Sequence, residues 1–387
     1  MKRESQTSLV GESVRAILRN QGDNGAIVAS PDFAQYNFCW LRDGSFSAYA
    51  LDCAGEHEAS ALYHAWVNGA LEGIASVIDG VIGVHQRGGE LDHSRMPPAR
   101  FALNGSVVVD EWPNFQIDGY GTWLWSLGQH LESQGRDSVP EELHDSVRRV
   151  ARYLATFALS PCYDVWEENG NSIHTSTLAC VYGGLATAGR LLRDDEFIAA
   201  AESVRSHVAS SGDDAGFYVK SNTNGDVDAS SLWLSAPFGV VDSSDEFFTK
   251  TVELIEDRLT LDGGIRRYGS DVYFGSGAWP VLTASLGWHY VEIGDIEAAT
   301  RCQAWIESHY RSNGTLGEQY GGENRDVRNY RAWEEKWGPP AHNLMWSHAM
   351  YVVLSLAIES GRSALLSRVD RSGSRSPGSV RSSEYTT

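Results

Sequence analysis

The segment YDVWEE at residues 163–168 has the clearest potential for chemistry, because it places two adjacent carboxyl groups, Glu167 and Glu168, beside an indole ring. A carboxyl group packed against an aromatic face loses part of its hydration, which raises its pKa and lets it act as a general acid near neutral pH. A further carboxyl group, Glu318, lies far downstream in the segment GTLGEQY at 314–320. Either group alone is more often a solvated surface residue. Together they meet the minimum requirement for glycoside hydrolysis, which is a pair of carboxyl groups at separate positions.

Three further clusters combine charged with aromatic residues, as sugar-binding pockets do. They lie at 36–44 (YNFCWLRDG), 110–119 (DEWPNFQIDG) and 266–274 (RRYGSDVYF). In the first cluster, Arg42 and Asp43 offer hydrogen-bond donors and acceptors to neighbouring hydroxyl groups. Aromatic faces suit the apolar C–H faces of sugars, although most of the 13 Trp and 16 Tyr residues belong in the core. The three clusters are therefore candidates for the walls of a sugar pocket.

Helices must position these segments, because apolar residues recur at intervals of three and four wherever a periodicity is present. The clearest apolar stripes lie at 143–157, 178–192 and 346–358. Between the stripes, clusters rich in Gly, Asn and Asp favour turns and predict loops. Short alternating pieces at 74–84 and 107–109 predict hairpin arms at the rim of the fold.

Glycine-rich loops join the predicted helices, and no proline-rich linker divides the chain. We therefore predict one all-α domain over residues 1–360, with its chemistry on the loops. The Ser/Arg-rich segment at 361–387 predicts a disordered tail.

Composition excludes several classes of function. The chain has 31 Lys and Arg residues against 51 Asp and Glu residues, for a net charge of −20, and such a surface repels nucleic acid and anionic lipid. It contains no stretch of 18 or more uncharged apolar residues, and its first residues lack the apolar segment of an export signal. We expect no nucleic-acid partner, no membrane partner and a cytoplasmic location.

The five cysteines are scattered and show no CxxC spacing, which favours reduced thiols over disulfides or a zinc site. The sequence also lacks an HExxH motif and a tight His/Asp cluster. We interpret His85, His93, His289 and His348 as packing or hydrogen-bonding residues. We expect no metal and no other cofactor.

The order of the motifs resembles that of one enzyme family. WxRD at 40–43 is followed by WxxxQxDG at 112–119, YDxWEE at 163–168, RRY at 266–268, EQ at 318–319 and WSHA at 346–349. From about Pro31 to Ala357, this series resembles the catalytic domain of glycoside hydrolase family 15, the glucoamylase-type enzymes. The resemblance implies an (α/α)6 barrel, a pocket built from the loops at one end, and inversion at the anomeric carbon.

The resemblance also implies roles for individual residues. Glu167 corresponds to the general acid and Glu318 to the general base. The implied substrate-binding residues are Tyr36, Arg42, Asp43, Trp112, Gln116, Trp166, Glu168, Arg267, Tyr273 and Trp346. A second carboxylate pair, Glu334 and Glu335, lies between Trp333 and Trp337 and makes Glu335 a rival for the base. Glu318 is favoured because it lies in the EQ motif.

These features predict an exo-acting inverting α-glucosidase that releases β-glucose from a small oligosaccharide. The chain has no recognisable starch-binding module, which favours short α-1,6-linked substrates such as isomaltose. A trehalase or glucoamylase of the same family is the alternative within this class. From other classes, a silent sugar-binding protein would lack one carboxylate, and an inverting phosphorylase would replace the base with a phosphate site. The presence of both Glu167 and Glu318 argues against these two.

Overall fold

The computed structural model describes residues 8–361 except 91, 113 and 322–324. Helices dominate the described chain, and their bounds are α1 Leu9–Arg19, α2 Leu41–Cys53, α3 His57–Gly73, α4 Ala75–Gln86, α5 Asp118–Ser133, α6 Glu141–Phe157, α7 Thr175–Leu192, α8 Asp195–Ser211, α9 Glu246–Leu259, α10 Pro280–Ile293, α11 Ile296–Ser308, α12 Val327–Trp337 and α13 Met345–Ser360. Two short strand pairs join them: β1 (Cys39–Trp40) with β2 (Arg100–Phe101), and β3 (Thr260–Leu261) with β4 (Gly264–Ile265).

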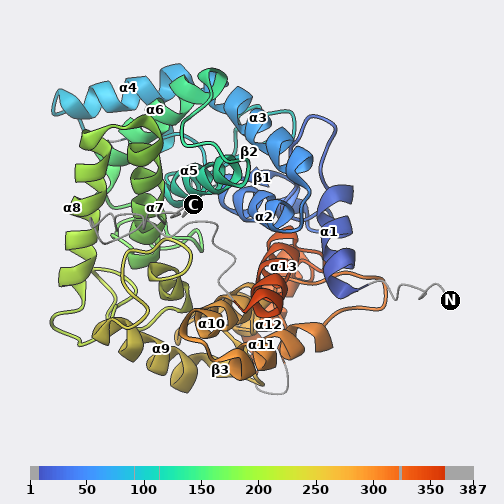
Figure 1. Ribbon diagram of the computed structural model, residues 1–387. Helices are drawn as coiled ribbons and strands as arrows, with labels where there is room; N and C mark the ends of the chain where they lie inside the picture. The colour runs from blue at the N-terminus through green and yellow to red at the C-terminus, as the bar shows by residue number, and fades with distance from the viewer. Residues whose placement is uncertain (1–7, 91, 113, 322–324, 362–387) are drawn as a thin grey trace, which may run out of the picture.

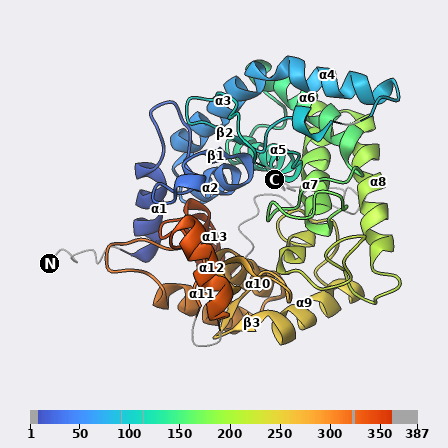
Figure 2. The same cartoon turned by 180° about the vertical axis from the view of Figure 1, so that it is seen from behind.

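The helices form two concentric rings (Figure 1). The inner ring runs α13, α2, α5, α7, the 3₁₀ segment η3 (Ala229–Leu234) and α10, each packed against the next. Helices α1, α3, α6, α8, α9 and α11 lie outside it, and the view from behind shows the same arrangement (Figure 2). These six inner and six outer elements alternate along the chain, with α4 and α12 as additional helices, which confirms the predicted (α/α)6 barrel.

The inner helices are apolar on nearly every face because they are enclosed by their neighbours and by the outer ring. Small residues let them approach closely. A Cβ atom at Gly121 of α5 would lie 2.2 Å from the backbone oxygen of Cys180 on α7, so only glycine fits this contact. Inside the ring, Phe46 stacks on Trp346 at a centroid distance of 5.7 Å. One continuous apolar core therefore supports the loops at both ends of the barrel.

The three predicted apolar stripes are confirmed as α6, α7 and α13. The predicted hairpin arm at 74–84 is wrong, since these residues form α4 and the residue before it. Ile74, Ile78 and Ile82 recur every fourth position and are buried, which is a helical stripe. Residues 107–109 lie in a loop with one isolated bridge, Phe101 to Val107.

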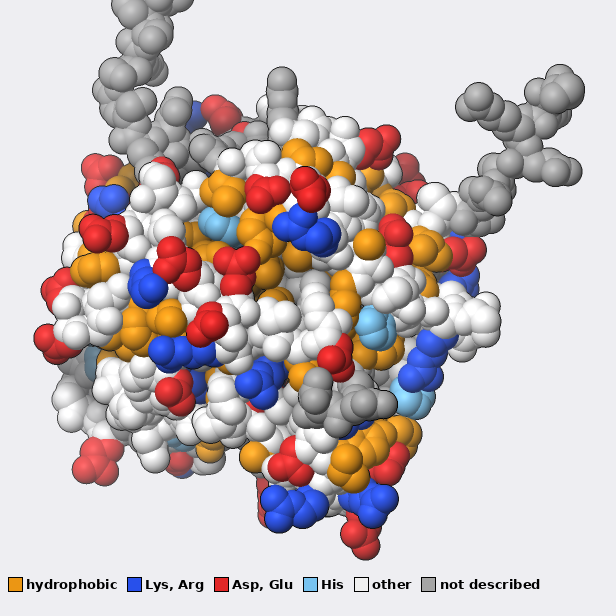
Figure 3. Space-filling model, turned by 90° about the horizontal axis from the view of Figure 1, so that it is seen from below, with side chains coloured by type: hydrophobic (Ala, Val, Ile, Leu, Met, Phe, Trp, Pro, Cys, Tyr) orange, Lys and Arg blue, Asp and Glu red, His pale blue; other side chains and the backbone are white. Residues whose placement is uncertain are grey.

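The predicted tail at 361–387 lies outside the described residues except for Gly361, which follows the end of α13. In the described part of the chain, no single helix is long and apolar enough to cross a bilayer, and α3 with α4 passes that test only as a pair bent by 58°. On the face shown in Figure 3, acidic and basic side chains are interspersed and apolar side chains lie in scattered groups.

Candidate active site

A cavity of about 340 Å³ lies where the inner helices begin. Arg42 and Asp43 come from the first turn of α2, Trp346 from the first turn of α13, and Trp279 directly precedes α10. The loop before α7, the loop between α11 and α12, and α12 itself also contribute to the wall. The lining residues are Ala29, Phe33, Gln35, Tyr36, Trp40, Arg42, Asp43, Trp112, Val165, Trp166, Glu167, Glu168, Arg267, Tyr273, Trp279, Glu318, Trp333, Lys336, Trp337, Leu344 and Trp346.

Glu167 occupies a tight turn that Asp164 closes. The Asp164 Oδ1 atom accepts hydrogen bonds from the backbone N–H groups of Trp166 (3.0 Å) and Glu168 (2.8 Å). The backbone N–H of Glu167 donates to the Asp164 carbonyl at 3.0 Å. Aspartate favours such turns because its short side chain bonds to the backbone two residues on. Glu167 itself has a left-handed backbone with φ of 62°, which is unusual for a residue other than glycine.

The side chain of Glu167 meets a buried guanidinium. Arg42 donates through Nη2 to Glu167 Oε1 at 3.1 Å and through Nη1 to Asp118 Oδ2 at 2.9 Å. Burial raises the pKa of Glu167 to about 7, although Arg42 acts in the opposite direction, and the charges of Asp43 and Asp118 add to the rise. A carboxyl group with this pKa carries a proton for much of the time near neutral pH.

Glu318 lies in the same cavity and is 1% exposed. Its Oε1 atom accepts hydrogen bonds from the hydroxyl groups of Tyr36 (2.8 Å) and Tyr273 (3.4 Å). Its Oε2 atom has no hydrogen-bond partner among the described residues. Burial raises the pKa of Glu318 to about 8, and the charge of Glu167 adds to the rise, while Tyr36 and Arg267 act in the opposite direction. The two carboxyl groups are thus close enough to influence each other.

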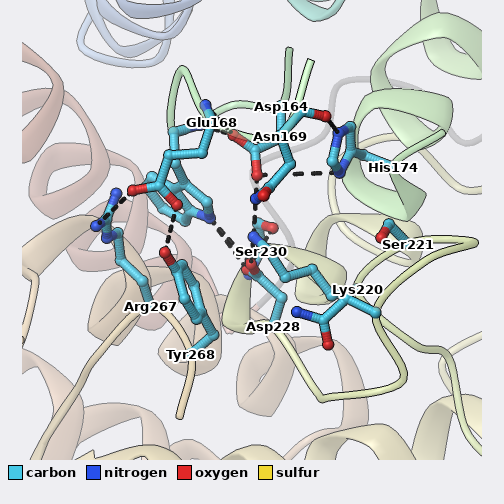
Figure 4. A network of polar contacts seen from close by, with 12 residues as sticks. Asp164, Glu168, Asn169, His174, Lys220, Ser221, Asp228, Ser230, Arg267 and Tyr268 are labelled. Carbon is cyan, nitrogen blue, oxygen red and sulfur yellow. Dashed lines mark hydrogen bonds and ion pairs between the residues drawn. The ribbon is translucent and has the colours of Figure 1, made fainter. Parts of the chain in front are cut away.

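Glu168 points towards a second arginine, Arg267 (Figure 4). Its Oε1 atom accepts a hydrogen bond from Arg267 Nη2 at 3.2 Å, and its Oε2 atom accepts one from the Tyr268 hydroxyl. Asp271 holds Arg267 from the other side through Nε at 3.0 Å. Arg267 is 2% exposed, so these contacts fix its guanidinium in the wall of the cavity.

Several polar atoms in the cavity wall have no hydrogen-bond partner within the described chain. They are the indole Nε1 atoms of Trp40, Trp112, Trp279 and Trp346 and the Oδ2 atom of Asp43, which forms an ion pair with Arg42 Nε at 3.4 Å. A buried polar atom without a partner costs about 1–3 kcal/mol. Aromatic faces beside unpaired donors and acceptors match a sugar, which has apolar C–H faces and a rim of hydroxyl groups.

The sequence matches the family model of glycosyl hydrolases family 15 over residues 5–305. The chain belongs to glycosyl hydrolases family 15. It is 35% identical to isomaltose glucohydrolase of Kribbella flavida over 354 residues, which is 90% of this chain and 91% of the relative. It is therefore a glycoside hydrolase. The part of this chain that matches the family model includes Glu167 and ends before Glu318.

Solved structures agree with this family membership. A glycosidase that is 34% identical superposes with a TM-score of 0.87 and covers 91% of this chain and 96% of its own, and a variant of it was solved in complex with glucose. A glucoamylase of Saccharomycopsis fibuligera superposes with a TM-score of 0.70 at 17% identity, covering 92% and 96% of the two chains. The second likeness concerns the fold alone.

The predicted site residues of this family 15 chain converge on the cavity with one exception. Gln116 is buried and is not among the lining residues. The rival carboxylate Glu335 is exposed on α12 and does not line the cavity, whereas Glu318 does. Sequence reasoning missed Trp279, whose position before Pro280 at the start of α10 is a helix-start signal.

One group of residues elsewhere in the barrel has the composition of a metal site. Asp52, His64 and His130 are buried, and their ligand atoms lie within 4.8 Å of one another. They come from the last turn of α2, from α3 and from the last turn of α5, at the end opposite to the cavity. Both carboxylate oxygen atoms of Asp52 already accept hydrogen bonds, from His57, Ser60 and His130. Asp52 therefore links α2 to α3 and α5.

Proposed function

We propose that the protein is an exo-acting, inverting α-glucosidase that removes a terminal glucose from short α-glucosides such as isomaltose and releases it as β-glucose. One observation carries this proposal: two carboxyl groups, the partly buried Glu167 and the buried Glu318, line the same aromatic cavity but come from different loops with different partners. Inverting glycosidases need two carboxyl groups with a water molecule between one of them and the sugar.

Glu167 is the proposed general acid, which protonates the glycosidic oxygen as the bond to the leaving sugar breaks. Its raised pKa, about 7, keeps a proton available near neutral pH. Arg42 bonds to Oε1 at 3.1 Å and fixes the direction of the carboxyl group. The second oxygen atom is then the one that faces the substrate.

Glu318 is the proposed general base. Tyr36 and Tyr273 donate to Oε1, so they stabilise the ionised form and leave Oε2 for the attacking water. The water gives its proton to Oε2 as its oxygen atom bonds to the anomeric carbon from the face opposite to the leaving sugar. This displacement yields β-glucose from an α-glucoside.

The pKa values of the free cavity do not by themselves rank the two groups, since they are about 7 for Glu167 and about 8 for Glu318. A bound substrate is expected to move the two pKa values apart. The glycosidic oxygen accepts a hydrogen bond only from protonated Glu167, which raises the pKa of that group. The nucleophilic water donates to ionised Glu318, which lowers its pKa. Because the groups interact, they titrate as a pair, and substrate favours the form with the proton on Glu167.

The terminal glucose is held deep in the cavity by the buried residues of α2. Arg42 and Asp43 are 5% and 6% exposed, and the core residue Phe46 lies one turn further along the same helix. The core therefore closes the inner end of the cavity, which admits a chain end rather than the middle of a polymer. Asp43 Oδ2, which accepts no hydrogen bond from the described residues, and the indole N–H groups are the proposed partners of the sugar hydroxyl groups.

The mouth of the cavity favours short substrates. Trp333 and Trp337 of α12 line it, and Trp333 packs edge-on against Tyr273 at a centroid distance of 4.9 Å. Rigid aromatic walls select ligands by shape. The 35% identical relative is named isomaltose glucohydrolase, which supports an α-1,6-linked disaccharide as the substrate. The five free thiols support a cytoplasmic location, which we propose as well.

A screen of glucose disaccharides tests the proposal. Isomaltose, maltose and trehalose are incubated with the enzyme, released glucose is measured, and the first anomer formed is identified by NMR. We expect the highest kcat/KM on isomaltose and β-glucose as the first product, with Glu318→Gln as the inactive control. α-Glucose as the first product would overturn the inverting mechanism, and a preference for trehalose would overturn the substrate assignment.

A further inference from the structure

A buried lysine lies behind the turn that carries Glu167. Lys220 is 3% exposed and belongs to the loop between α8 and η3. Its Nζ atom donates to Asp164 Oδ2 at 3.0 Å and to Asp228 Oδ2 at 2.7 Å. Burial lowers the pKa of Lys220, but these two carboxylates outweigh that effect and raise it above its ordinary value, so the ammonium stays charged. Lysine is almost never buried without such partners.

The two carboxylates complete a ring of hydrogen bonds through Trp166. Asp164 accepts the backbone N–H of Trp166 at 3.0 Å, and Asp228 accepts its indole Nε1–H at 3.0 Å. Lys220 joins Asp164 to Asp228 and so closes the ring. Figure 4 shows the labelled members of this network converging from separate segments of the chain.

Both neighbours of Glu167 are therefore tied to the network. Trp166 is bound through its backbone and its indole, and the backbone N–H of Glu168 is bound to Asp164 at 2.8 Å. Between them, Glu167 holds its left-handed backbone, which costs about 1–3 kcal/mol and persists only where the surroundings enforce it. The side chain of Glu167 itself accepts a hydrogen bond from Arg42 of α2.

Lys220 also supports the substrate-binding side of the turn. Its Nζ atom lies 4.1 Å from the ring centroid of Tyr268, and the Tyr268 hydroxyl donates to Glu168. Desolvated cation–π contacts of this kind stabilise the position of a ring. The Lys220 ammonium group thus contacts the carboxylates that hold Trp166 and the tyrosine that bonds to Glu168.

We propose that Lys220 is a positioning residue for the general acid: by bridging Asp164 and Asp228, it holds the turn that aims Glu167 at the glycosidic oxygen. This inference rests on the role proposed for Glu167. Lys220 lies outside the residues that line the cavity, so it acts on the reaction through the turn and not through the substrate. Misplacement of a catalytic group by about 1 Å can lower the rate by roughly a hundredfold.

Substrates with different leaving groups test the proposal. Isomaltose needs proton donation to its leaving sugar, whereas α-glucosyl fluoride releases fluoride with little help from an acid. We expect Lys220→Met to lower kcat on isomaltose by about tenfold to a hundredfold, and kcat on α-glucosyl fluoride by less than about threefold. Equal losses on both substrates, or an unchanged kcat on isomaltose, would overturn the proposal.

Two companion variants keep the test sharp. Lys220→Met with Asp228→Asn removes the bridge while leaving the net charge of the cluster unchanged, so it carries the test if the single variant does not fold. Ile78→Val lowers stability at the buried face of α4, whose main contacts are with α3 and α6, and should leave the ratio of the two kcat values unchanged.

Glu167→Gln separates this inference from the function on which it rests. We expect that variant to show the same dependence on the leaving group, only stronger. If Glu167→Gln shows it and Lys220→Met does not, the positioning role is wrong and the acid assignment stands. If Glu167→Gln loses activity equally on both substrates, the acid assignment is wrong and the positioning role falls with it.

Discussion

Replacing Glu318 with glutamine is expected to stabilise the folded protein at alkaline pH and to leave its stability nearly unchanged at pH 4.5. Burial raises the pKa of Glu318 from 4.5 to about 8. Between these values the folded protein binds a proton that the unfolded chain has lost, so the free energy of unfolding falls as the pH rises through this window. Below it, both states carry the protonated group. Glutamine does not ionise, so this contribution to the fall in the free energy of unfolding is absent from the variant.

The structure sets the size of this effect. At roughly 1.4 kcal/mol per pKa unit, the shift from 4.5 to about 8 corresponds to about 5 kcal/mol above pH 8. Water that enters the cavity relieves part of the cost of burying the charge, so we expect about 2–5 kcal/mol. For a chain of 387 residues, an unfolding entropy of about 2.1 cal/mol/K per residue makes 1 kcal/mol equal to about 1 °C in Tm. The expected gain at pH 9 is therefore about 2–5 °C.

Thermal unfolding followed by circular dichroism at pH 4.5, 7 and 9 measures the gain. The informative quantity is how the Tm difference between variant and wild type changes with pH, because steric effects of the amide are the same at each pH. Glu335→Gln is the matched control, since Glu335 is exposed on α12 and its replacement should give no pH-dependent gain. A Tm difference between variant and wild type that is equal at pH 4.5 and pH 9, or that becomes less favourable to the variant at pH 9, would refute the reasoning.

Three further predictions concern the reaction. Glu167→Gln and Glu318→Gln should each lower kcat on isomaltose by at least about a hundredfold, with Glu335→Gln near wild type; the reverse pattern for Glu318 and Glu335 would reassign the base. A crystal structure should place the two catalytic carboxyl groups about 6.5–9.5 Å apart, since a spacing near 5 Å belongs to retaining enzymes. Trp333→Ala should raise kcat/KM on soluble starch relative to isomaltose by opening the mouth of the cavity, and an unchanged ratio would show that α12 does not select substrate length.

Helices can be predicted from the sequence where local physics decides the structure. The apolar stripes at 143–157, 178–192 and 346–358 predicted helices because a single buried face imposes that spacing. The hairpin arm predicted at 74–84 is wrong because a short run rich in Val and Ile suits a strand or a helix, and only its packing on the barrel selects the buried stripe of α4. The secondary structure of this segment thus depends on contacts with residues that are distant in the sequence.

Residue types alone determined what chemistry this chain can perform: two carboxyl groups for acid and base, arginines for hydroxyl groups and indoles for sugar faces. The tertiary structure decided which carboxyl groups perform it. Glu318 and Glu335 both lie near aromatic residues in the sequence, yet Glu318 is 1% exposed inside the cavity and Glu335 is on the surface. Burial and the bridge from Lys220 to Asp164 arise when distant segments pack together. Desolvation and charge pairing, which set the pKa and the aim of a carboxyl group, depend on that packing and not on the adjacent residues.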